Sequence, residues 1–188
     1  YLLGEQDRIV GVSGYAVRPP QVRREKPRVS AFISADVPKI LALEPDLVLA
    51  FSDMQADIAA ALVRAGIAVH AFNQRDIAGI LAMIRAVGAL VNAAARANEL
   101  ADGYECRLAA IAALKRNAPR PKVYFEEWDD PLISGIGWVS ELIGIAGGDD
   151  VFPKLQQHKA AKDRIVTLDA VRADMPDIII ASWCDKNV

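Results

Sequence analysis

The sequence is poor in the residues that build catalytic and metal sites. It has two cysteines, Cys106 and Cys184, and two histidines, His70 and His158, and none of them stands in a metal-binding or redox spacing. The cysteines could be free thiols or could form a disulfide. The paired-histidine zinc motif, the glycine-flanked nucleophilic serine and the glycine-rich phosphate loops are all missing from the sequence. These absences argue against an enzyme.

The sequence also lacks a strong net charge and a long apolar run. Its formal net charge is -2, so no electrostatic field selects nucleic acid or an anionic membrane surface. No stretch approaches the roughly 18 apolar residues that span a bilayer, and no basic-then-apolar secretion signal opens the chain. The first residues read like the end of a helix, and the last ones follow directly after a strand-like run. We therefore expect a chain cut inside a fold at both ends.

Short apolar runs alternate with amphipathic segments along most of the chain. The run 47–51 is apolar throughout, as in a strand covered on both faces, and Gly66 ends a helical pattern over 53–65. This strand–helix–strand order predicts parallel βαβ units. We predict strands at 8–12, 28–32, 47–51, 67–72, 123–125 and 178–180, and helices at 37–43, 53–65 and 138–145.

A proline-free segment rich in alanine and leucine, residues 76–117, interrupts this alternation. It predicts one helix ending near Gly88 and a long helix from about Asn92 to Asn117. A helix of that length could lie on the surface of one domain or connect two lobes rigidly. We expect the connection, with an N-terminal α/β lobe over 1–90, an interlobe helix over 91–118 and a C-terminal α/β lobe over 119–188.

One internal similarity supports two lobes. Residues 42–50, ALEPDLVLA, parallel residues 173–181, ADMPDIIIA, and in both a short helix is expected to end at Pro-Asp before a buried strand. The offset of 131 residues, obtained as 176 minus 45, is too large for a solenoid repeat. It fits a duplicated lobe.

Large aromatic residues follow, or end, several of the predicted strands. In open α/β sheets, ligands bind outside the carboxyl ends of the strands, and aromatic faces there suit a broad, mostly apolar ligand. The alternative is core packing beneath loops. The shared position of five aromatics favours a ligand cleft lined by Tyr15, Phe32, Phe51, Trp128 and Trp183.

Residues 126–130, EEWDD, place four acidic side chains within five positions at a strand end. Such a cluster could form a metal site or an acid–base site. A solvated loop is the more ordinary interpretation, and we expect it here.

Several segments resemble a known family. Residues 8–15, RIVGVSGY, followed by a Pro-Pro pair, and residues 40–48, ILALEPDLV, resemble the N-terminal lobe of the periplasmic vitamin B12-binding proteins. In the second half, residues 134–135, 147–152 and 176–179 resemble the C-terminal lobe of the same proteins. These belong to a class of binding proteins of ABC transporters that also serves haem and iron-siderophores.

The resemblance implies two α/β lobes with parallel sheets, joined by one long helix in the manner of class III substrate-binding proteins, with the ligand between the lobes. It implies a corrinoid carried as cargo, without a cofactor or catalysis, and delivered to the membrane permease subunits of an ABC transporter. It also implies a periplasmic or cell-surface location. By the same resemblance, the ligand positions are Tyr15, Phe32 and Phe51 in the first lobe, and Trp128, Leu132 and Trp183 in the second.

Family members present one acidic residue on each lobe to arginines of the transporter. In this sequence the second-lobe position matches Asp169, whereas the first-lobe position falls on Pro38, with Asp36 two residues earlier. A haem or iron-siderophore ligand is the alternative within the class. A metallocluster enzyme of the nitrogenase type would need bridging cysteines that do not match Cys106 or Cys184. A cytoplasmic ligand-binding module also stays open.

Overall fold

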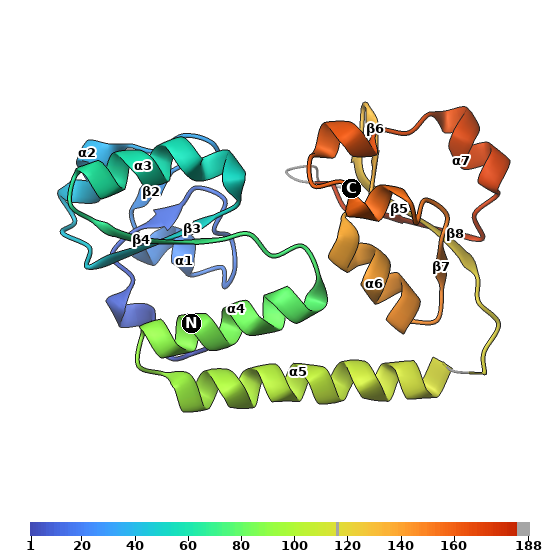
Figure 1. Ribbon diagram of the computed structural model, residues 1–188, viewed down its shortest axis with the longest axis horizontal. Coiled ribbons are helices and arrows are strands. Elements are labelled where there is room, and N and C mark those ends of the chain that lie inside the picture. Colours follow the sequence, from blue (N-terminus) through green and yellow to red (C-terminus); the bar gives the residue numbers. More distant parts are fainter. Residues whose placement is uncertain (116, 184–188) are drawn as a thin grey trace. The chain divides into compact units, whose positions relative to one another are not determined.

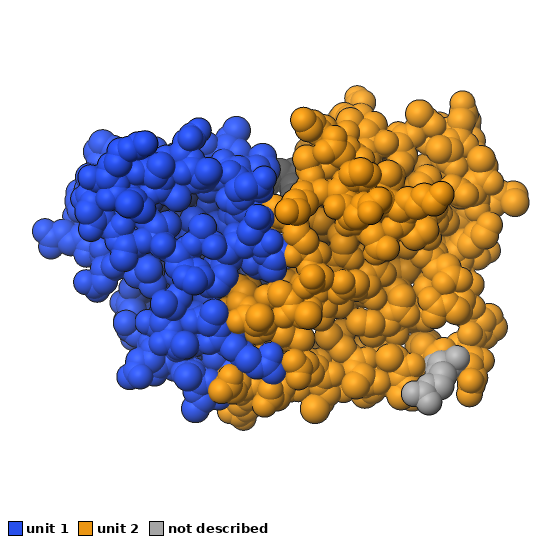
Figure 2. Space-filling view, viewed as in Figure 1, with its two compact units in different colours: residues 1–74, 85–97 blue, residues 75–84, 98–188 orange. Residues whose placement is uncertain are grey.

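The computed structural model describes residues 1–115 and 117–183, which divide into two compact units (Figures 1 and 2). Unit 1 comprises residues 1–74 and 85–97, and unit 2 comprises residues 75–84 and the described residues from 98 onward. Helices α4 (Ile77–Leu90) and α5 (Ala94–Lys115) each contribute to both units. Helix α5 is the predicted long helix and begins two residues later than expected. The lobe boundaries at 90 and 118 stay predictions.

Unit 1 contains two pairs of parallel strands. In one pair, β1 (Val12–Ser13) lies beside β2 (Arg28–Ser30), and in the other, β3 (Leu47–Phe51) lies beside β4 (Ala68–Phe72) in unbroken register. The parallel βαβ prediction is therefore confirmed here. The connecting segments contain α1 (Val22–Glu25), α2 (Val37–Leu41) and α3 (Ala56–Arg64), the last preceded by the 3-10 turn η2 (Asp53–Gln55).

The predicted strand at 8–12 is wrong over most of its length. Residues Gln6–Arg8 form the 3-10 turn η1. The guanidinium of Arg8 donates a hydrogen bond to the Val91 carbonyl oxygen at 2.5 Å, and Val10 is 43% exposed. The segment satisfies a carbonyl group just after α4 instead of joining the sheet.

The turn between α4 and α5 depends on two special positions within unit 1. Asn92 adopts a left-handed backbone with φ of 57°, which asparagine tolerates better than most residues. Gly88 lies against α5, where a Cβ atom would come within 2.1 Å of the Ala97 Cβ. Ala97 is fully buried, so the two helices pack through these small residues.

Unit 2 is built on one long central strand, β5 (Lys122–Asp129). It pairs parallel with β7 (Asp149–Asp150) and β8 (Ile178–Ala181), and antiparallel with β6 (Leu132–Ser134). Val123 pairs with both β7 and β8, and Glu126 with both β6 and β8. Strand β8 therefore occupies one edge of β5, and β6 and β7 share the other edge.

The core of unit 2 lies between β5 and helix α6 (Gly137–Ile145). Val123, Val139 and Ile143 are buried there, with Phe125 and Ile136 packed against them. Short turns η3 (Leu155–Gln157) and η4 (Ala161–Arg164) lead to helix α7 (Leu168–Asp174), which precedes β8 (Figure 1). No helix in the described part of the chain has both the length and the apolar character needed to cross a bilayer.

Candidate functional site

The predicted site residues of unit 1 lie at the carboxyl ends of its parallel strands. Tyr15 follows β1, Phe32 follows β2, and Phe51 is the last residue of β3. The side chains of Tyr15 and Phe32 are exposed, at 57% and 40%, and Phe51 is half-buried. Exposed aromatic rings at this end of a sheet are available to a ligand rather than used as core.

Local hydrogen bonds hold the backbone at all three of these residues. The Gly14 N–H donates to the Ser30 carbonyl oxygen at 2.7 Å, which keeps the chain beside β2 until just before Tyr15. The Tyr15 N–H donates to the Ser13 hydroxyl at 3.3 Å. Sequence reasoning missed Gln55, whose side chain contacts the backbones of Phe32 and Phe51.

In unit 2, residues 126–129 of the acidic run 126–130 belong to a strand instead of the solvated loop that the sequence predicts, and Asp130 alone is exposed in a turn. Strand β5 continues through Asp129, because the antiparallel partner β6 extends the ladder beyond the three-residue strand expected from apolar residues. Glu126 and Glu127 are half-buried. The carboxylates of Glu126 and Glu127 are satisfied by Trp183 and Arg164, so that the strand can include acidic residues.

The predicted aromatic residues of unit 2 contact this strand end. The Trp183 indole N–H donates to the Glu126 carboxylate at 3.0 Å, and the Trp128 indole N–H donates to the Asp130 carbonyl oxygen at 3.0 Å. Leu132 begins β6 and pairs with Asp129. The structure thus gathers Trp128, Leu132 and Trp183 around the carboxyl end of β5. Cys184, next to Trp183, lies outside the described residues.

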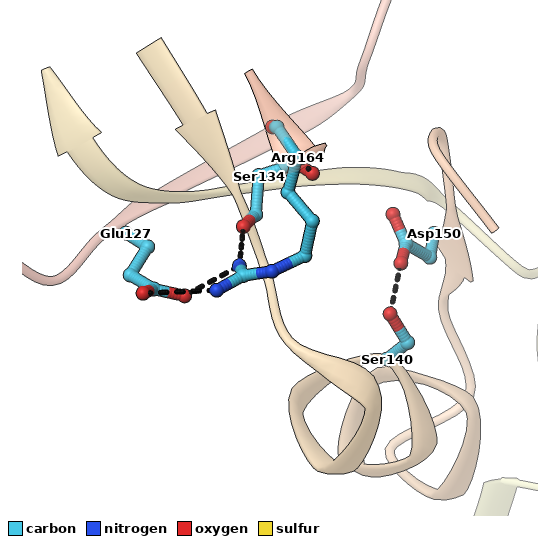
Figure 3. A network of polar contacts seen from close by, with 5 residues as sticks. All are labelled: Glu127, Ser134, Ser140, Asp150 and Arg164. Carbon is cyan, nitrogen blue, oxygen red and sulfur yellow. Dashed lines mark hydrogen bonds and ion pairs between the residues drawn. The ribbon is translucent and has the colours of Figure 1, made fainter. Parts of the chain in front are cut away.

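A buried arginine fixes the same strand end (Figure 3). Arg164, only 2% exposed, forms a two-pronged ion pair with Glu127, with N–O distances of 2.6 and 3.2 Å. Its guanidinium also donates to the Ser134 carbonyl oxygen, and the Ser134 hydroxyl donates to the Arg164 carbonyl oxygen at 3.2 Å. Nothing in the local sequence marked Arg164, because 37 residues separate it from Glu127.

Glu127 occupies a β-bulge in the pairing of β5 with β6. The ladder pairs Glu126 with Ser134 and then Trp128 with Ile133, so Glu127 is the extra residue. A bulge changes the direction of the side chains that follow it. By holding Glu127, Arg164 therefore stabilises the bulge that directly precedes Trp128.

A second polar contact in Figure 3 anchors α6 to Asp150, the last residue of β7. The Ser140 hydroxyl donates to the Asp150 carboxylate, whose other oxygen accepts the Phe152 N–H at 2.9 Å. Phe152 packs edge-to-face on Tyr124, with ring centroids 5.8 Å apart. The pKa of the Tyr124 hydroxyl is raised well above its ordinary value. Burial is the larger cause, and the negative charge of Glu126 adds to it.

The two predicted docking residues differ in their surroundings. Asp36 caps α2, and its carboxylate accepts the Lys39 N–H at 3.0 Å. The Asp169 side chain is 93% exposed in the first turn of α7, with the Arg172 guanidinium 3.6 Å away. An exposed pair at that distance contributes little to stability. Asp169 is therefore accessible, whereas Asp36 already has a structural role.

Among residues 1–115 and 117–183, other chemistry-bearing groups do not assemble into a site. Cys106 is an exposed free cysteine in α5. No group of three histidine, cysteine or acidic side chains within the described residues is arranged to hold a metal ion. A shallow hollow of about 360 Å³ lies at the amino end of β5, lined partly by Arg120, Ser140 and Asp149, and none of the predicted site residues lines it.

Sequence comparisons show which known proteins this chain resembles. A family model described as periplasmic binding protein matches residues 1–188. The chain is 23% identical over 185 residues to a vitamin B12-binding protein of Vibrio campbellii, covering 97% of this chain and 66% of that protein. It is 27% identical over 189 residues to a cobalamin-binding protein of Halobacterium salinarum, covering 93% and 51%. The chain thus spans between half and two thirds of the length of these relatives.

Solved structures agree in fold. The periplasmic vitamin B12-binding protein of Vibrio cholerae superposes with a TM-score of 0.79 at 23% identity, covering 97% of this chain and 71% of that one. A periplasmic haem-binding protein of Pseudomonas aeruginosa gives 0.82 at 20% identity, covering 99% and 68%. The predicted fold class, parallel-sheet α/β with a long helix of the class III type, is confirmed.

Proposed function

The chain belongs to the periplasmic binding protein family, and on that basis we propose that the whole protein is the solute-binding component of an ABC importer and carries a corrinoid. The observation that carries the proposal is the sequence similarity, over 97% and 93% of the chain, to proteins named as vitamin B12-binding and cobalamin-binding. The ligand is cargo, bound and released without chemical change.

The side chains at the strand ends support a broad ligand. A corrinoid presents a large ring face that aromatic side chains can cover. The candidate side chains are Tyr15, Phe32 and Phe51 in unit 1, and Trp128, Leu132 and Trp183 in unit 2. The indole of Trp183 is oriented by Glu126, and the hairpin carrying Trp128 and Leu132 is held through Arg164. Such fixed aromatic groups lower the entropy cost of binding.

We propose the membrane permease as the partner, with the protein acting in the periplasm or at the cell surface. The exposed carboxylate of Asp169 is available to a transporter arginine, and carboxylate–arginine pairs form strong charge-assisted hydrogen bonds. Asp36 is the weaker candidate for the first lobe, because its carboxylate already caps α2.

The experiment that tests the ligand assignment is purification of the full-length protein from its native host, followed by absorbance and mass spectrometry of the bound small molecule. A corrinoid spectrum with a matching mass is expected. Recovery of haem or a ferric siderophore instead would reassign the ligand within the same class. Recovery of the protein in the cytoplasmic fraction after cell fractionation would contradict the proposed location.

A further inference from the structure

Gln55 connects the ends of the two strand pairs of unit 1. Its Nε2 donates to the Phe32 carbonyl oxygen at 2.7 Å, and its Oε1 accepts the Phe51 backbone N–H at 2.9 Å. Phe32 follows β2 and Phe51 ends β3, and these strands belong to different two-stranded sheets. One side chain therefore bridges two segments that each carry a predicted ligand-contacting ring.

The turn before Gln55 sends its side chain back to β3. Ser52 has a left-handed backbone with φ of 71°, is 4% exposed, and donates its N–H to the Phe72 carbonyl oxygen at 2.6 Å. Its hydroxyl accepts the Met54 N–H at 3.3 Å and starts the turn η2. This buried, strained turn returns the chain so that Gln55 lies opposite Phe51.

A side-chain amide can form hydrogen bonds with both of the backbone groups that Gln55 contacts. One is a carbonyl oxygen, which needs a donor, and the other is an N–H, which needs an acceptor. Glutamine offers both, ionised glutamate offers only acceptors, and leucine offers neither. The loop after β2 closes through the Ala31 N–H to the Ser34 carbonyl oxygen at 2.8 Å, and Phe32 and Ile33 are exposed, so packing holds this loop weakly.

We propose that Gln55 is a positioning residue that fixes the separation of Phe32 and Phe51, so that both rings meet the ligand together. This inference rests on the proposed function, because it assigns the two rings to the ligand site. Gln55 itself acts through backbone contacts and need not touch the ligand.

Amide hydrogen exchange at Phe51 tests the bridge without any ligand. Gln55→Leu removes the acceptor, and the Phe51 N–H is expected to exchange at least tenfold faster. Gln55→Glu keeps an acceptor, and the rate is expected to stay near that of the wild type. Met54→Ala is the matched control, since Met54 lies in the same turn with its side chain 57% exposed. An unchanged exchange rate of the Phe51 N–H in Gln55→Leu would contradict the bridge that Gln55 forms between Phe32 and Phe51.

Calorimetric titration of the full-length protein with cyanocobalamin tests the positioning role. At pH 7.5 we expect affinity to fall about tenfold in Gln55→Leu and Gln55→Glu, and to stay unchanged in Met54→Ala. The affinity of Gln55→Glu should recover towards about pH 4, where a carboxyl gains a proton and can again donate. Wild-type affinity in Gln55→Leu would overturn the positioning role, whereas no binding by the wild type would overturn the proposed function itself.

Discussion

Glu44 and Met175, 131 residues apart, adopt the same left-handed backbone, with φ of 48° and 47°. Each residue directly precedes a Pro-Asp pair and a strand. The Glu44 N–H donates to the Leu41 carbonyl oxygen at 3.0 Å, and the Met175 N–H donates to the Arg172 carbonyl oxygen at 3.2 Å, again 131 residues apart. The sequence similarity between the two halves therefore extends to the backbone.

The correspondence begins at the helix cap. Asp36 caps α2 by accepting the Lys39 N–H, and Thr167 caps α7 by accepting the Ala170 N–H at 3.2 Å. The offset is 131 in each case, so Thr167 is the counterpart of Asp36. The two segments therefore correspond from this cap to the first residue of the following strand, and Asp169 corresponds to Pro38.

Glycine at either left-handed position should stabilise the protein. Glu44→Gly and Met175→Gly remove the steric cost of this backbone at exposed side chains, and we expect the free energy of unfolding to rise by up to about 1 kcal/mol. Arg172→Gly, within α7, is the control and should lower it by about 1 kcal/mol. Urea denaturation measures all three. If Glu44→Gly or Met175→Gly lowers the free energy of unfolding as much as Arg172→Gly does, the steric cost assigned to the left-handed backbone at these positions is contradicted.

Truncating Glu127 should cost more than replacing Arg164. Glu127→Ala leaves a guanidinium that is 2% exposed without its counter-ion, and we expect a loss of about 3–5 kcal/mol in the free energy of unfolding. Arg164→Met keeps the apolar volume, and the Glu127 side chain, 35% exposed, can still contact water. The double variant should therefore be more stable than Glu127→Ala alone. Denaturant unfolding that shows additive losses would contradict a coupled pair.

Tyr124 should make the protein sensitive to alkali. An unfolded tyrosine loses its proton near pH 10, as expected for a free side chain, whereas the raised pKa keeps the folded residue protonated. Above about pH 10 the unfolded state binds fewer protons, so the free energy of unfolding falls as pH rises, by up to about 1.4 kcal/mol per pH unit. Unfolding curves of the wild type and Tyr124→Phe at pH 8 to 11 measure this, and parallel pH profiles would contradict it.

Asp169→Ala should weaken association with the transporter without changing ligand affinity. In the proposed docking, the exposed carboxylate attracts a basic surface of the transporter, and the loss should be larger at low salt. Asp163→Ala, an exposed acidic residue in η4, is the control for net charge. Binding to the cognate transporter in nanodiscs at two salt concentrations provides the measurement. Equal association of wild type and Asp169→Ala at low salt would remove the docking role.

Local patterns predicted most of the regular structure. The apolar run 47–51 is β3 over its whole length, and the proline-free segment contains α4 and α5. The predicted strand at 8–12 fails because Arg8 is used at the end of α4, a contact 83 residues away in sequence. Strand β6 and the acidic half of β5 were not predicted, because cross-strand pairing and Arg164, not apolar periodicity, stabilise them.

The positions of the site aromatics followed from strand ends, whereas their supports did not. Tyr15, Phe32 and Phe51 could be named because each lies where an apolar run stops. Gln55 and Glu126 make contacts that depend on turn geometry and on the pairing of distant strands, and single-sequence patterns carry no signal for either.

Calorimetric titration with cyanocobalamin, on the full-length wild type, Trp183→Ala and Trp138→Ala, tests the central claim most directly. Trp138 lies in α6 and is 37% exposed, so it controls for the loss of a tryptophan outside the proposed site. We predict binding by the wild type and Trp138→Ala, and affinity at least tenfold weaker in Trp183→Ala, with little change in melting temperature. Absence of corrinoid binding by the wild type, together with tight binding of haem or a ferric siderophore, would contradict the account.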